Sequence, residues 1–229
     1  MIDLPSFRPR GVVFDLDGTL VDNMALHAQA FERFAEAHDL PPLTMDLRRR
    51  IDGKRNSEIF PMLFEREMTM DEVLRFEEEK EGAYRQISRG RIAPVRGSLT
   101  LLARLEALGI GVAVATSAPL KNVEHTLSET GLAARLPIIA RGDEVPRGKP
   151  FPDVFALAAE RLRVPVDECL AFEDAPIGVA AANAAGMVVV AVATTFSEAQ
   201  FNAHIPAPHA VVSDYEAFLD GPGQWLRPR

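Results

Sequence analysis

Two acidic residues close to the amino terminus are spaced so that both can take part in one reaction. They belong to Asp15-Leu16-Asp17-Gly18-Thr19-Leu20, which follows the apolar run Gly11-Val12-Val13-Phe14. In an extended chain, residues i and i+2 point to the same side, so Asp15 and Asp17 are expected to leave a strand together. Gly18 then allows a sharp turn. Such a pair suits phosphoryl transfer, in which one carboxylate attacks phosphorus and the other exchanges a proton with the leaving oxygen. The alternative is an ordinary surface turn.

Three later segments also carry polar side chains where chemistry is expected. Thr116 and Ser117 end an apolar run before a helix start, where hydroxyl and N–H groups bind phosphate oxygens or simply cap the helix. Lys149, in a stiff Gly-Lys-Pro loop, is either solvated or the ammonium that keeps a nucleophilic carboxylate ionised. Glu173 and Asp174 end another apolar run, and such a pair needs a cation. An oxygen-only ligand set favours Mg²⁺ over a transition metal.

The elements that must position these residues alternate regularly between strands and helices from Ser98 onward. The predicted strands are Gly11–Phe14, Gly111–Ala115, Pro137–Ala140, Cys169–Phe172 and Met187–Ala193. The helices predicted between them are Leu99–Leu108, Leu120–Thr130, Asp153–Arg163 and Pro176–Ala185. Continuous apolar strands joined by helices are typical of a parallel sheet covered on both faces. The sequence therefore predicts a doubly wound, Rossmann-like α/β domain.

Residues 23–93 show helical periodicity without a convincing strand. Their predicted helices are Met24–His38, Met45–Ile51, Ser57–Phe64 and Asp71–Ile87. Because ligands bind beyond the carboxyl ends of parallel strands, a helical block inserted there is expected to act as a lid. We predict an all-α cap domain of residues 23–93 on a core of residues 1–22 and 94–229, with hinges near residues 21–23 and 93–95. The charged run 77–81 is expected to form a solvated helix face.

Composition limits the class of protein and its partners. The chain has 229 residues, of which 47% are hydrophobic and 25% charged, as expected of a folded globular protein. A net charge of −8 disfavours nucleic acid and anionic membranes as partners. No signal peptide or membrane-spanning segment is recognisable, so a cytoplasmic location is expected. The single cysteine, Cys169, excludes an internal disulfide and is expected to be buried. We expect a monomer, with a weak dimer as the alternative.

The segments D-x-D-G-T, T-S, K-P and E-D, in this order, resemble the motifs of the haloacid dehalogenase (HAD) superfamily of aspartate-nucleophile phosphotransferases. The helical insert is similar to the cap of the branch that includes β-phosphoglucomutase and sugar-phosphate phosphatases. The resemblance implies that Asp15 becomes an aspartyl-phosphate and that Asp17 is the general acid/base. It further implies phosphate binding by Gly18, Thr116, Ser117 and Lys149, of which Thr116 and Lys149 also belong to the catalytic set. The implied Mg²⁺ site consists of Asp15, the backbone carbonyl of Asp17 and Asp174, with Glu173 as a direct ligand or just outside it.

Within the insert, the segment Gly53-Lys54-Arg55-Asn56-Ser57-Glu58 resembles the substrate-specificity loop of that branch, and Gly53, Lys54, Arg55 and Asn56 are its candidate specificity residues. His27 and Lys80 fall where the branch places a histidine near the acid/base and a cap lysine. The mutases carry the loop arginine about one position later, where this chain has Asn56. For His27, an ordinary helix-face histidine is the alternative.

The expected activity is Mg²⁺-dependent hydrolysis of a small phosphorylated metabolite, such as a sugar or polyol phosphate. The alternative is a mutase, in which the cap grips a phosphate already on the sugar; Lys54, Arg55 and Lys80 make this possible. Thr19 favours hydrolysis, because the mutases resembled more often have valine at this position. Dehalogenase chemistry is disfavoured, because a dehalogenase has no phosphoryl charge to neutralise. A non-catalytic module that only binds a phosphometabolite is also disfavoured, because it would not need Asp17.

Overall fold

The predicted α/β fold is confirmed by a computed structural model, which describes residues 4, 6–203 and 205–226. Within these residues, six parallel strands form one sheet in the order β5-β4-β1-β6-β7-β8. The strands are β1 (Gly11–Phe14), β4 (Gly111–Thr116), β5 (Ile139–Arg141), β6 (Cys169–Glu173), β7 (Val188–Val192) and β8 (Ala210–Val212).

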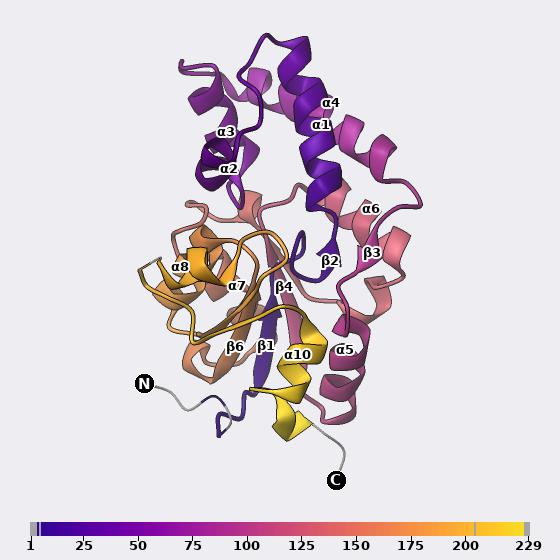
Figure 1. The fold of residues 1–229 in the computed structure, drawn as a ribbon, viewed down its shortest axis with the longest axis vertical. Coiled ribbons are helices and arrows are strands. Elements are labelled where there is room, and N and C mark those ends of the chain that lie inside the picture. The colour runs from indigo at the N-terminus through magenta and orange to yellow at the C-terminus, as the bar shows by residue number, and fades with distance from the viewer. Residues whose placement is uncertain (1–3, 5, 204, 227–229) are drawn as a thin grey trace.

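Helices cover both faces of this sheet (Figure 1). Val12 and Phe14 of β1 join one apolar cluster, whereas Val13 points to the other, as the alternation of a strand requires. The first cluster includes residues of α5 (Ser98–Ala107), α6 (Leu120–Thr130) and α10 (Tyr215–Asp220). The second includes residues of α7 (Asp153–Leu162), α8 (Pro176–Ala185) and α9 (Glu198–Asn202). Short 3₁₀ helices lie at η1 (Ala133–Arg135), η2 (Gly142–Glu144), η3 (Val166–Glu168) and η4 (Gln224–Leu226).

Strand β1 lies at the centre of the sheet, between β4 and β6. Phe14 is in register with Val114 on one side and with Phe172 on the other. The N–H of Asp15 still donates to the Phe172 carbonyl oxygen at 3.0 Å. The chain order reverses across β1, and such a switch point is where open parallel sheets bind ligands.

Four helices form an insert that lies over the carboxyl ends of the strands (Figure 1). They are α1 (Met24–Ala37), α2 (Met45–Ile51), α3 (Asn56–Leu63) and α4 (Met70–Ser88), and each end agrees with its prediction to within one residue. The insert, by which we mean α1–α4 with their connecting loops, has an apolar cluster of its own. In this cluster, Phe34 contacts Phe60 and Phe76 through their rings.

A short two-stranded ribbon joins the two passages of the chain between core and insert. β2 (Val21–Asp22) pairs antiparallel with β3 (Ala93–Pro94), at the positions where hinges are predicted. Strands of two residues carry no recognisable periodicity, so the sequence does not predict this pairing. Elsewhere in the described residues, Cys169 is buried as expected, and none of the helices combines the length and apolar character that crossing a bilayer requires.

Candidate active site

Asp15 and Lys149 form a buried ion pair at the carboxyl end of β1. Lys149 Nζ lies 2.7 Å from Asp15 Oδ1 and 2.5 Å from Glu173 Oε1. Burial disfavours the charge of the lysine, but the two carboxylates outweigh this effect and raise the pKa of Lys149 above its ordinary value. The predicted nucleophile therefore has a permanent cation beside it.

Three buried carboxyl groups meet around this lysine. Asp15, Glu173 and Asp174 each offer an oxygen within 4.8 Å of the others. Burial raises the pKa of Asp15 to about 7, although Lys149 acts in the opposite direction. Burial and the charges of Glu173 and Asp15 also raise the pKa of Asp174 well above its ordinary value. One ammonium does not balance three carboxylates, so the cluster suits a divalent cation that prefers oxygen ligands.

The two acids at the end of β6 differ in their remaining hydrogen-bonding capacity. Glu173 binds Lys149 with Oε1 and accepts the N–H of Ala175 with Oε2 at 2.9 Å. Asp174 accepts the hydroxyl of Thr19 with Oδ1 at 3.1 Å, whereas its Oδ2 is buried without a hydrogen-bond partner in the described part of the chain. Glu173 is thus engaged in holding Lys149, and Asp174 retains an oxygen with which a metal can bind.

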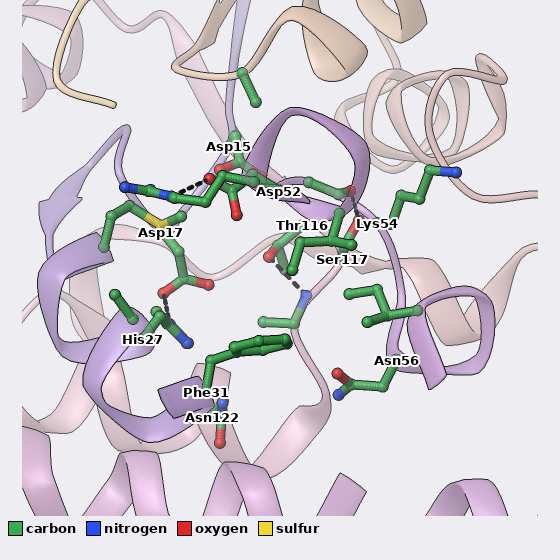
Figure 2. A pocket seen from close by; sticks show the side chains of 18 of the residues that line it. Asp15, Asp17, His27, Phe31, Asp52, Lys54, Asn56, Thr116, Ser117 and Asn122 are labelled. Atoms are coloured by element: carbon green, nitrogen blue, oxygen red, sulfur yellow. Dashed lines mark hydrogen bonds and ion pairs between the residues drawn. The ribbon is translucent and has the colours of Figure 1, made fainter. Parts of the chain in front are cut away.

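Asp17 is held by two neighbours that reach it from the start of α1. Its Oδ1 accepts the side-chain N–H of Asn23 at 2.5 Å, and His27 Nε2 lies 3.5 Å from the same oxygen, an ion-pair distance without hydrogen-bond geometry. The ring of His27 stacks on Tyr84 at 3.7 Å. Figure 2 shows Asp17 and His27 facing each other in the pocket. Sequence reasoning did not identify Asn23, because asparagine before a helix is usually read as a cap.

Gly18 allows a left-handed turn after Asp17 and leaves room for the side chain of Asp174. Its φ of +77° lies in the left-handed region, and a Cβ added there would lie 2.0 Å from Asp174 Oδ2. Its N–H donates to the Val21 carbonyl and to the Asn23 side chain. Gly18 lies outside the set of residues that line the pocket, and its N–H is used within the turn.

Thr116 and Ser117 line the pocket at the end of β4. Thr116 Oγ1 accepts the N–H of Ala118 at 3.0 Å, which turns the chain toward α6. Ser117 Oγ donates to the Gly53 carbonyl oxygen of the insert at 2.7 Å. The predicted phosphate-binding segment therefore also contacts the predicted specificity loop (Figure 2).

The predicted insert residues separate into two groups. His27, Gly53, Lys54, Asn56 and Lys80 line the same pocket as Asp15 and Asp17. Arg55 does not: its Nη1 donates to the core carbonyl oxygens of Gly142 at 3.1 Å and Val145 at 3.2 Å. Its guanidinium is thus directed to the core backbone.

The charged run 77–81 is only partly solvated, so that expectation is wrong for its last two residues. Lys80 and Glu81 are buried, because the rotation of α4 directs them into the pocket. Glu81 accepts hydrogen bonds from Asn56 at 2.8 Å, from Asn122 of α6 at 2.7 Å and from Lys80. Sequence reasoning missed Glu81 and Asn122. For Lys80 a signal existed, because it lies on the helical stripe that also carries Phe76 and Tyr84.

Comparison with known proteins gives a consistent result. Residues 12–192 match the family model described as "Haloacid dehalogenase-like hydrolase". The chain is 32% identical to the phosphorylated carbohydrates phosphatase of Thermotoga maritima, covering 77% of this chain and 81% of that protein. It is 33% identical to hexitol phosphatase A of Escherichia coli (81% and 83%) and 29% identical to the β-phosphoglucomutase of Bacillus subtilis (80% and 83%).

A solved structure agrees with these relatives. The HAD hydrolase of family IA, variant 3, from Entamoeba histolytica superimposes with a TM-score of 0.82 at 25% identity, covering 95% of this chain and 99% of that one. The four motifs meet at the switch point of a fold shared with that hydrolase, and the family model spans most of the sheet. The chain therefore belongs to the haloacid dehalogenase-like hydrolases.

Proposed function

We propose that this protein is a Mg²⁺-dependent phosphatase that hydrolyses a small sugar or polyol phosphate through an aspartyl-phosphate on Asp15. The observation that carries the proposal is the separation of the two aspartates. Asp15 is paired with Lys149, whereas Asp17 lies beside Asn23 and His27 on the pocket side of the turn. Two phosphatases among the relatives, one for phosphorylated carbohydrates and one for hexitols, support this substrate class.

The metal would be held by Asp15, Asp174 and the backbone carbonyl of Asp17. The unpartnered Asp174 Oδ2 and the excess of buried carboxylates over cations in the described cluster support this site. When bound, the ion would supply positive charge against the transferring phosphoryl group. Glu173 would act through Lys149, to which it is bonded.

The reaction follows from the roles of these side chains. A carboxylate oxygen of Asp15 attacks phosphorus, and the bond between phosphorus and the leaving oxygen breaks while Asp17 gives that oxygen a proton. Lys149 favours the ionised form of Asp15, and Thr116 with the N–H of Ser117 binds the phosphoryl oxygens. Asp17 then takes a proton from the water that attacks the phosphorus of the aspartyl-phosphate. This step releases phosphate and regenerates both aspartates.

The insert would act as a cap domain of residues 23–93. Its loop contacts the core through Ser117, and its two chain passages pair in the β2–β3 ribbon. We propose that rotation at this ribbon opens the pocket for substrate and closes it for the reaction, because closure excludes bulk water from the phosphoryl group. Scattering profiles that stay unchanged on addition of substrate analogue and Mg²⁺ would contradict this motion.

The test is phosphate release from a panel of sugar and polyol phosphates with Mg²⁺. We expect turnover of at least one member and its loss in Asp15→Asn, a near-isosteric change that removes the nucleophile. Asp46→Asn is the matched control, because Asp46 is exposed on α2 and does not line the pocket. A mutase is the second candidate, favoured by the Bacillus subtilis relative. Conversion of β-glucose 1-phosphate to glucose 6-phosphate without phosphate release would establish it and overturn the proposal.

A further inference from the structure

The positive charges of the insert that line the pocket are largely neutralised by carboxylates of the insert itself. Lys80 Nζ donates to Glu81 Oε1 and to Asn56 Oδ1, the latter at 3.3 Å. Arg48 Nε donates to Asp52 Oδ2 at 2.9 Å. All five residues line the pocket. Two cations that point toward the substrate space thus each have an acidic partner before any substrate binds.

Glu81 is a firmly held anion. Its two oxygens accept hydrogen bonds from Asn56, Lys80 and Asn122, and the residue is only 4% exposed. Burial by itself raises the pKa of Glu81, but the charges of Lys80 and His27 and the hydrogen bonds outweigh it and lower the pKa to about 2. Glu81 is therefore a carboxylate near neutral pH, and it lies in direct contact with the amino group of Lys80.

The loop between α2 and α3 carries two further cations, Lys54 and Arg55. Lys54 lines the pocket, but Figure 2 shows its amino group directed away from Asp15 and Thr116. Arg55 donates to Gly142 and Val145 of the core and pairs with Glu58 at 3.1 Å. Neither the ammonium nor the guanidinium group of this loop faces the reacting carboxylates across the pocket.

The pocket groups that remain to contact the leaving group are hydrogen-bond donors and apolar side chains. Lys80 has three protons, of which two are used on Glu81 and Asn56, so one is left for a substrate oxygen. Asn122 has a second amide proton beyond the one it gives Glu81. Phe31 and Ile59 supply apolar contact from the same wall. Hydroxyl groups and carbon atoms match these surroundings.

Resting on the proposed phosphatase function, we infer that the substrate is a monophosphate with a neutral, hydroxyl-bearing leaving group, and that Glu81 excludes a second phosphate by neutralising Lys80. A second phosphate dianion at Lys80 would be desolvated beside the Glu81 carboxylate. Like charges repel strongly in a buried site, and the other described cations of the insert wall are paired or directed away. A mutase has to hold such a bisphosphate, so the same pairing disfavours that reaction.

The wild-type enzyme alone tests the inference. Glucose 6-phosphate is compared with glucose 1,6-bisphosphate, and fructose 6-phosphate with fructose 1,6-bisphosphate, by phosphate release at saturating Mg²⁺. For each pair in which the monophosphate is hydrolysed, we expect kcat/KM for the bisphosphate to be at least about 10-fold lower. A bisphosphate that is hydrolysed as well as its monophosphate overturns the inference and leaves the proposed phosphatase function intact. Absence of release from every compound in the panel contradicts that function instead.

A charge variant tests the role of Glu81 itself. Glu81→Gln keeps the size of the side chain and frees the charge of Lys80, so the kcat/KM ratio of monophosphate to bisphosphate should narrow by about 10-fold. Glu77→Gln is the matched control: Glu77 accepts from the same Asn56 amide at 3.1 Å, but it has no hydrogen bond with Lys80. The control ratio should stay within about 2-fold of the wild type. An unchanged ratio in Glu81→Gln, or equal narrowing in both variants, overturns the role of Glu81.

Discussion

Arg55, in the insert, donates a hydrogen bond of 3.1 Å to the carbonyl oxygen of Gly142, 87 residues later in the core. The same Nη1 donates to the Val145 carbonyl oxygen at 3.2 Å, and Nη2 pairs with Glu58 at 3.1 Å. A Cβ on Gly142 would lie 3.1 Å from the Arg55 side chain, so the arginine lies directly against this backbone. Arg55 thus fastens the insert to the core at the edge of the pocket.

Arg55→Met should weaken substrate binding more than chemistry. Methionine keeps the apolar stem but removes the hydrogen bonds to the core, so we expect KM for a sugar phosphate to rise about 10-fold and kcat to change by less than about 3-fold. Hydrolysis of p-nitrophenyl phosphate, which has no sugar to enclose, should change little. Arg49→Met, at an exposed arginine of α2, serves as the control. Equal losses of kcat/KM with both substrates would mean that Arg55 does not act by holding the insert closed over the sugar.

Lys149→Met should cost both activity and stability. The variant leaves Asp15 and Glu173 as buried carboxylates without their cation, which costs about 3–5 kcal/mol of unfolding free energy. Loss of this charge beside the nucleophile should lower kcat by at least about 10³-fold. Urea unfolding and steady-state turnover measure the two effects. In Lys121→Met, which breaks an exposed ion pair with Glu78, stability should change by less than about 1 kcal/mol.

Gly18→Ala should inactivate the enzyme through geometry alone. The added methyl group would lie 2.0 Å from Asp174 Oδ2, so either the turn or the carboxylate has to move. Gly109→Ala is a matched control, because Gly109 has a similar φ of +66° but no described atom within 4 Å of the place that its methyl group would take. The control should lose about 1 kcal/mol of stability and keep its turnover. Wild-type turnover in Gly18→Ala would show that the turn tolerates displacement.

The core of the site was predictable because its residues share one kind of position. Asp15, Thr116 and Asp174 end or follow apolar strands, and parallel strands bring their carboxyl ends to one edge. Lys149 could be assigned to the same edge from its motif, although the sequence alone did not show its bond to Glu173. The end of a strand can be recognised from the local sequence, and a parallel sheet places the residues at the carboxyl ends of adjacent strands next to one another. This is why the fold and the core motifs could be read from the chain.

The insert residues were less predictable because their contacts depend on how helices are rotated and docked. Glu81 belongs to a run of charges that is hydrophilic in any window, yet it is buried against Asn122 of another helix. Arg55 lies in the predicted specificity loop, but the core carbonyls that orient it belong to residues 142 and 145. Such pairings follow from tertiary packing, which local patterns do not contain.

Removal of the metal should stop the reaction, and Asp174→Asn should raise the Mg²⁺ concentration needed for half-maximal activity by at least about 10-fold. The reason is that Asp174 Oδ2 is a buried carboxylate oxygen without a hydrogen-bond partner among the described residues. Mg²⁺ should also raise the thermal midpoint of the wild type but not of the variant, because a ligand of the folded state stabilises it. Asp143→Asn, at an exposed aspartate, controls for net charge. Identical Mg²⁺ responses in all three proteins would exclude Asp174 as a ligand.

The contribution of Glu81 to stability should depend on pH. Its pKa in the folded protein is lowered from 4.5 to about 2, so the stabilisation is present above pH 4.5 and is lost as the pH falls toward 2. The shift corresponds to about 3 kcal/mol at most. The difference in unfolding free energy between wild type and Glu81→Gln, measured in urea, should therefore shrink between pH 6 and pH 3. In Glu77→Gln the trend should reverse, because burial raises the pKa of Glu77 and its charged form opposes folding at higher pH. A Glu81→Gln difference that is constant with pH would mean that Glu81 is not held as a buried anion.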